Sequence, residues 1–104
     1  MDKVFVVTTE IVTLDDFNVN VEGVFTSEED AKKRMRAAID FACVSQKENL
    51  EFDYEDEVDE LGYDSFDEYW EDWVKDNFVT PNFWRLNEEE MTIVVAISKR
   101  TLNE

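Results

Sequence analysis

The sequence contains no histidine, one cysteine, one proline and two glycines in 104 residues. Without histidine the chain lacks the commonest general base and the commonest metal ligand, which excludes Ser-His-Asp and Cys-His catalysis and histidine-based zinc sites. The single cysteine, Cys43, cannot form a disulfide within the chain, and this favours a reducing compartment. The scarcity of glycine and proline disfavours long irregular loops. We therefore expect most of the chain in helices and strands.

Long hydrophobic runs are also missing. No stretch approaches the roughly 20 apolar residues of a membrane-spanning helix, and the first ten residues, MDKVFVVTTE, lack the apolar core of a signal peptide. Apolar residues still make up 43% of the chain, which argues against disorder. The sequence predicts one domain, residues 1–104, in a cytoplasmic protein that does not engage membranes, and a monomer is favoured.

Acidic residues are abundant and unevenly placed. The chain has 27 acids against 10 bases, for a net charge of −17. Residues 48–76 hold fourteen of the acids and one base, Lys75, whereas residues 1–47 contribute −3 and residues 77–104 contribute −1. Solubility alone is served by a net charge of about 2–8 spread over a small domain. A chain this acidic repels nucleic acid and attracts basic surfaces, so we expect no direct nucleic-acid binding.

Four segments are rich in β-branched and aromatic residues and alternate with turn formers. They are residues 3–13, 19–25, 83–86 and 91–101. The sequence LDDFN at 14–18 predicts the turn of a hairpin between the first two.

Three helices are predicted between these strands. The first follows a capping signal at Thr26-Ser27 and extends to about Lys47, with apolar residues every three to four positions. Residues 48–61 fit either a strand or a helix, and a short helix over 53–61 is favoured. Gly62 predicts a helix end, and the spacing of Ser65 and Glu68 predicts a capping box that opens a third helix. The order ββ-α-α(α)-ββ predicts an α+β fold, with helices packed on one face of a largely antiparallel four-stranded sheet.

The third helix, over residues 64–77, separates two kinds of side chain. One face carries Phe66, Tyr69, Trp70, Trp73 and Val74, and we expect it to anchor the helix on the sheet. The opposite face carries Asp67, Glu68, Glu71, Asp72 and Asp76. Like charges one helical turn apart cost a few tenths of a kcal/mol per pair, so helix stability does not account for this acidic face.

The concentrated acids have two interpretations: a solvated surface, or a surface that imitates the phosphates of nucleic acid. Exposed helices usually mix charges of both signs, and a ratio of fourteen to one favours the second. In size, acidity and charge placement the chain resembles DNA-mimic inhibitors such as anti-restriction proteins, phage anti-CRISPR proteins and the uracil-DNA glycosylase inhibitor. The resemblance rests on residues 48–76.

This resemblance implies a phage-encoded inhibitor, without enzymatic activity or cofactor, that occupies the basic nucleic-acid-binding surface of a host defence nuclease such as a CRISPR–Cas complex. The predicted partner-binding residues are Glu51, Asp53, Glu55, Asp56, Glu57, Asp59, Glu60, Asp64, Asp67, Glu68, Glu71, Asp72 and Asp76. An immunity protein or antitoxin that neutralises a basic nuclease, or a small acidic interaction domain of another role, fits the same composition.

Two weaker patterns lie in the same region. Glu57, Asp59, Gly62 and Glu68 follow the spacing of an EF-hand loop, but Leu61 stands where a fifth-position ligand is needed. Paired carboxylates could also serve glycoside hydrolysis. However, the acids fall mostly on the convex face of a helix, so we predict neither a metal site nor catalytic residues.

Overall fold

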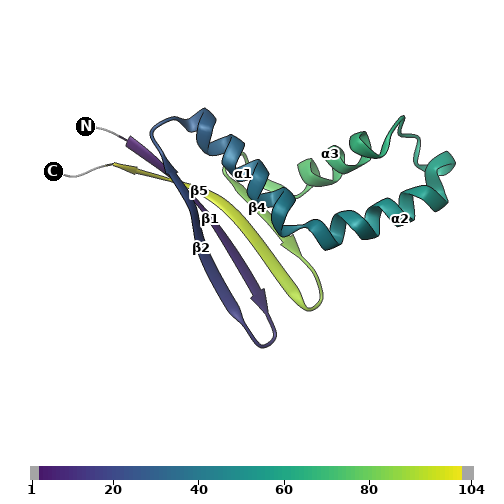
Figure 1. Cartoon of the computed structure of the whole chain (residues 1–104), viewed down its shortest axis with the longest axis horizontal. Coiled ribbons are helices and arrows are strands. Elements are labelled where there is room, and N and C mark those ends of the chain that lie inside the picture. The colour runs from purple at the N-terminus through teal and green to yellow at the C-terminus, as the bar shows by residue number, and fades with distance from the viewer. Residues whose placement is uncertain (1–2, 102–104) are drawn as a thin grey trace. The chain divides into compact units, whose positions relative to one another are not determined.

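The computed structural model describes residues 3–101, with the backbone alone for residues 57–61. Eight elements follow one another along the chain (Figure 1). They are β1 (Lys3–Thr13), β2 (Phe17–Phe25), α1 (Glu28–Ala42), α2 (Val44–Leu61), α3 (Phe66–Asp76), β3 (Phe78–Thr80), β4 (Phe83–Asn87) and β5 (Met91–Thr101). They form two compact units, one comprising Met1–Ala42 with Phe78–Glu104 and the other Cys43–Asn77. The expectation of a single domain stays a prediction.

The first unit is built on a five-stranded antiparallel sheet with the order β2-β1-β5-β4-β3. β1 and β5 form its centre and pair over eleven residues each, from Lys3 opposite Thr101 to Thr13 opposite Met91. This confirms the α+β class and the strands expected at residues 3–13 and 91–101. The four-strand expectation is wrong by one strand, because the three residues of β3 pair with β4 at the edge. A strand this short carries too little alternation to be recognised from sequence.

One face of this sheet carries the core of the unit. Buried side chains of β1, β5 and β4 come into register on it, as in the row that joins Thr9, Val95 and Trp84. α1 contacts β1, β2 and β5. It buries Ala31, Met35, Ala38 and Ile39, at the helical spacing that the sequence indicated. Each fully buried large apolar side chain contributes about 1.5–3 kcal/mol, so this face holds the sheet and α1 together.

The helix expected to extend to Lys47 ends earlier, at Ala42. Cys43 leaves helical geometry, with φ −107° and ψ 26°, and a new helix begins when the Lys47 amide donates to the Cys43 carbonyl at 2.9 Å. α2 then extends to Leu61, so the short helix expected over 53–61 is the end of an 18-residue helix. Cys43 itself is fully buried, as expected of a structural thiol. No proline or glycine marks this break, so it could not be predicted from the sequence.

Candidate partner-binding site

The second unit, Cys43–Asn77, is here called the acidic hairpin. Its two helices are joined by a short connection, and α3 returns alongside α2 (Figure 1). Gly62 ends α2 in the left-handed conformation, with φ 77°, which glycine adopts without the strain of a Cβ. The Ser65 hydroxyl then accepts the Glu68 amide at 3.2 Å, while the Glu68 carboxylate accepts the Asp64 amide at 3.2 Å. The sequence therefore located both helix boundaries correctly.

Aromatic rings hold the two helices of the hairpin together. Tyr54 on α2 lies 5.7 Å from the rings of Phe66 and Tyr69 on α3, edge-on to the first and stacked on the second. Tyr63, in the connection, lies 5.2 Å from Tyr69. Such pairs contribute about 0.5–1.5 kcal/mol each beyond area burial. These contacts outweigh the few tenths of a kcal/mol that each acidic pair on α3 costs.

A second contact between the two helices lies farther from their connection, near the start of α2 and the end of α3. Trp70 is buried and stacks on Trp73, with ring centroids 4.9 Å apart, and the Lys47 ammonium lies 5.4 Å from the Trp70 ring. The Asn77 side chain ends α3 by donating to the Trp73 carbonyl at 2.8 Å. The aromatic face of α3 thus meets α2 through named contacts. The expectation that it anchors on the sheet stays a prediction.

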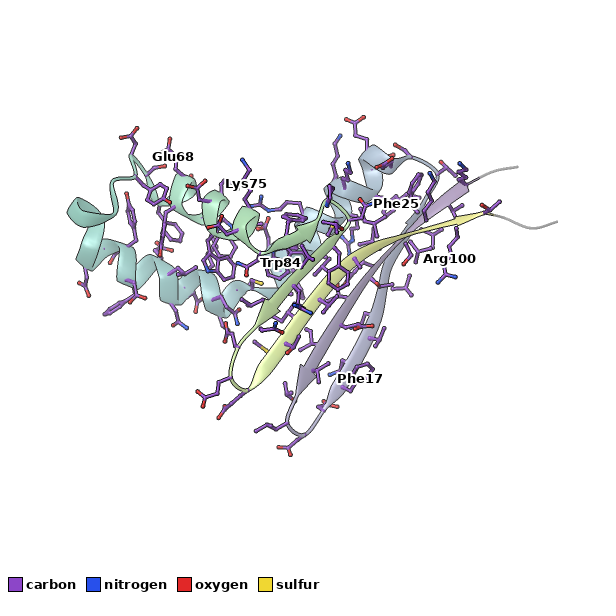
Figure 2. The ribbon with its side chains drawn as sticks, turned by 180° about the vertical axis from the view of Figure 1, so that it is seen from behind. Phe17, Phe25, Glu68, Lys75, Trp84 and Arg100 are labelled. Atoms are coloured by element: carbon purple, nitrogen blue, oxygen red, sulfur yellow. The ribbon has the colours of Figure 1, made fainter. Side chains whose placement is uncertain are left out.

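The acids of the hairpin lie outside this aromatic contact. Ten of the thirteen predicted partner-binding residues have described side chains, and all ten are exposed. They are Glu51, Asp53, Glu55, Asp56, Asp64, Asp67, Glu68, Glu71, Asp72 and Asp76. The side chains of Glu57, Asp59 and Glu60 lie outside the described residues. Figure 2 shows Glu68 and Lys75 pointing away from α2.

The basic side chains of α1 are engaged within their own unit. Lys32 pairs with Glu28, Lys33 with Glu29, Arg36 with Asp40, and Arg34 with Glu22 of β2, at 3.1–4.0 Å. None of these four pairs, which all join described residues, uses an acid of residues 48–76. Each of these four basic side chains therefore has an acidic partner within the first unit.

Four acids of α3 surround a shallow depression of about 360 Å³ that Tyr63 also lines. They are Asp67, Glu68, Glu71 and Asp72. The Tyr63 hydroxyl donates a hydrogen bond to the Asp72 carboxylate, and this bond raises the pKa of Tyr63 above its ordinary value of 10.0. Partial desolvation and the charges of Asp72 and Asp76 act in the same direction. The depression offers an aromatic ring beside several carboxylates, which suits a lysine or arginine side chain of a partner.

The spacing of the acids along the helices can be compared with that of phosphates. α2 has 18 residues and eight acids, and α3 has 11 residues and five acids. At 1.5 Å per residue, each helix carries about one carboxylate per 3.3–3.4 Å of axis. One strand of duplex DNA carries one phosphate per about 3.4 Å.

Phe52 is a feature that the sequence interpretation missed. Its ring is 68% exposed although it lies on α2. Acids stand at the neighbouring helical positions Glu48, Glu51, Glu55 and Asp56. The alternation of Leu50, Phe52 and Tyr54 is what makes residues 48–61 fit a strand as well as a helix, and a strand would place the three side chains on one face. In the helix, Leu50 and Tyr54 share a face and Phe52 does not, and this spacing could have identified it.

The EF-hand spacing does not fit the structure. α2 is helical through Leu61, so Glu57 and Asp59 belong to a helix and not to an EF-hand loop. Among the described side chains, no three cysteines or acids gather closely enough to hold a metal ion. None of the helices within residues 3–101 has the length and apolar character needed to span a membrane.

Comparisons of the chain with protein-family models, with curated proteins and with solved structures found no match.

Proposed function

We propose that the acidic hairpin binds the basic nucleic-acid site of a partner protein and excludes the nucleic acid from it. The observation that carries the proposal is the charge spacing: the sequences of two adjacent helices each place about one acid per 3.4 Å of helix axis, close to the spacing of phosphates along one strand of a duplex. The described acids of both helices are exposed, so they are available to a partner.

The aromatic contacts support the proposal because a mimic has to hold its charges in place. A disordered acidic segment would lose conformational entropy on binding. The ring contacts of Tyr54 and the cation–π contact of Lys47 fix α3 against α2 before any partner arrives. This preorganisation lowers the cost of association.

Phe52 extends the imitation beyond phosphate. Proteins that bind single strands combine basic grooves with surfaces on which bases stack. An exposed ring among four acids presents an apolar plane beside negative charge, as a base does beside its phosphates. The preferred partner is therefore a protein whose site accepts both groups. Host defence nucleases such as restriction or CRISPR–Cas complexes are the first to examine.

The mechanism is competition. The carboxylates take the places of phosphates against lysine and arginine side chains, and the partner cannot hold both ligands. Since the contacts are between exposed charges, binding weakens as salt rises and screens charges beyond about 8 Å. Favourable long-range attraction speeds association at low salt.

A capture experiment with two matched variants tests this function. The tagged chain is incubated with bacterial lysate, and retained proteins are identified. Charge reversal on α3, Asp67→Lys with Glu71→Lys and Asp72→Lys, is expected to abolish retention. Reversal of the exposed Glu88, Glu89 and Glu90 between β4 and β5 changes net charge by the same amount and should preserve it.

The identity of the captured protein separates the proposed function from its alternative. A nucleic-acid-targeting complex supports competition with nucleic acid, whereas a secreted toxin indicates an immunity role. If the variant with reversed charges on α3 still retains the same protein, the acidic face of α3 is a solvated surface and not a binding surface. Circular dichroism of both variants confirms that the hairpin is still folded.

A further inference from the structure

β2 lies at the edge of the five-stranded sheet, and within the described residues it pairs with β1 alone. Its outer edge presents backbone amide and carbonyl groups that can pair with another strand. Natural edge strands are commonly guarded by lysine, proline or an inward-pointing charge. The sequence of β2, FNVNVEGVF, contains no lysine, arginine or proline.

The first five residues of this strand, 17–21, combine exposure with strict alternation. Phe17, Val19 and Val21 share the sheet face of Val12, Glu10 and Thr8, and they are 49–64% exposed. Asn18 and Asn20 point to the other face and are also exposed. A β-bulge at Glu22 ends the alternation, since Val7 pairs with Gly23 and Thr8 with Val21. Figure 2 labels Phe17 near the end of the sheet where the chain turns from β1 into β2.

We propose that residues 17–21 pair antiparallel with the same residues of a second copy, so that two sheets join edge to edge in a two-fold dimer. Centred on Val19, this register places Val19 opposite its own counterpart and Phe17 opposite Val21. The remaining pairs are Asn18 opposite Asn20. The side chains of Phe17, Val19 and Val21 therefore meet on one face. On the opposite face the Asn18 side chain, which donates to the Asp16 carboxylate at 3.3 Å, can accept a hydrogen bond from Asn20 through its oxygen.

The charge of this segment favours a second copy over other partners. Residues 17–21 carry no charge, in a chain whose net charge is −17, so the pairing strands do not repel each other. The flanks bring Asp16 opposite Glu22, but Glu22 is already paired with Arg34 at 3.2 Å. A basic protein of the kind that the acidic hairpin attracts finds no carboxylate along these five residues.

The dimer is weak and depends on salt in a characteristic direction. Five paired residues bury less than the roughly 800 Å² per partner of a standard interface, which places the dimer among transient associations. Two chains of −17 repel each other at long range, and salt screens this repulsion. Added salt should therefore tighten the dimer, whereas it weakens binding to a basic partner. The two associations are independent and can be told apart.

Sedimentation velocity over a concentration series tests the proposal. At 0.5 M salt the wild-type chain is expected to shift from 12.3 kDa to twice that mass, with a Kd of about 10–100 µM. Val19→Lys brings two ammonium groups together at the centre and should raise the Kd at least about fivefold. Val24→Lys, on the same strand and face but beyond the bulge, is the matched control and should leave the Kd unchanged.

A mixing experiment tests the register itself. Val19→Lys and Val19→Glu should each be monomeric alone and should associate when mixed, because lysine then faces glutamate. A wild-type chain that stays monomeric over the whole series overturns the proposal. The proposal is also overturned if Val19→Lys leaves the Kd of the dimer unchanged, or if Val24→Lys raises the Kd as much as Val19→Lys does. Failure of the mixed Val19→Lys and Val19→Glu chains to associate overturns it as well.

Discussion

The phenol ring of Tyr54 on α2 stacks on the ring of Tyr69 on α3, with centroids 5.7 Å apart and planes inclined by 23°. Tyr54 is 9% exposed, and its hydroxyl donates to the Tyr63 carbonyl at 3.2 Å. One side chain thus contacts both α3 and the connection that leads into it. The position of the acidic face of α3 relative to α2 depends on this residue more than on any other named contact.

Replacing Tyr54 by alanine should destabilise the acidic hairpin by about 3 kcal/mol, since it removes a buried ring and leaves a cavity. Tyr54→Phe keeps the ring and loses one hydrogen bond, so it should cost about 1 kcal/mol or less. Urea unfolding and amide hydrogen exchange of α3 measure both. Equal effects of the two variants would show that the hydroxyl, and not ring packing, holds the helices together.

The Tyr63–Asp72 hydrogen bond gives a spectroscopic prediction. Absorbance titration of tyrosinate should show that Tyr63 ionises above pH 10.0, as a component that disappears in Tyr63→Phe, and Asp72→Asn should lower the pKa of Tyr63. Because the folded-state pKa exceeds the unfolded value, the associated stability is complete below pH 10.0 and is lost as pH rises through the folded-state pKa. An unchanged titration in Asp72→Asn would show that this carboxylate does not accept the bond.

Self-repulsion within the hairpin predicts a salt-dependent Tm. Raising NaCl from about 0.05 M to about 0.5 M should raise the Tm by several degrees, because the carboxylates of α2 and α3 are then screened from one another. Glu48→Gln with Glu51→Gln and Glu55→Gln should raise the Tm at low salt. The same change at Glu88, Glu89 and Glu90 is the control and should have a smaller effect. Thermal melts that do not respond to salt would mean that the acids are locally paired.

Phe52→Ala tests the exposed ring. A partner that accepts this ring in its site should bind about tenfold more weakly after the substitution, while the Tm stays close to that of the wild type because the ring is 68% exposed. Phe41→Ala removes another exposed ring, 83% exposed and on α1, and should leave affinity unchanged. Identical affinities for Phe52→Ala and the wild type would show that Phe52 does not imitate a base, and that only the carboxylates imitate nucleic acid.

The sequence indicated those parts of the fold that depend on local chemistry. Alternation in β1 and β5 and the side-chain caps at Ser27 and Ser65 are short-range features, and each was found where it was expected. The break at Cys43 was not foreseen, because apolar spacing continues across it and no breaker residue marks it. β3 was missed because three residues cannot show a period.

The candidate site was foreseen in part. Counting charges located the acidic segment, and helical spacing separated the acids of α3 from its aromatic face. The sequence did not show that α2 carries acids at the same axial spacing as α3, because residues 48–61 also fitted a strand. The packing of Tyr54 and the position of Lys47 over Trp70 follow only from tertiary contacts. The exposed ring of Phe52 could have been identified from its helical spacing, once residues 48–61 were assigned to a helix.

Displacement by duplex DNA tests the central claim most directly. The captured partner is immobilised, and its affinity for this chain is measured at increasing concentrations of duplex DNA and constant salt. Competition predicts that the apparent Kd rises in proportion to DNA concentration and that no complex holds both ligands. An apparent Kd that does not respond to saturating DNA, or a ternary complex of partner, DNA and this chain, would contradict the account.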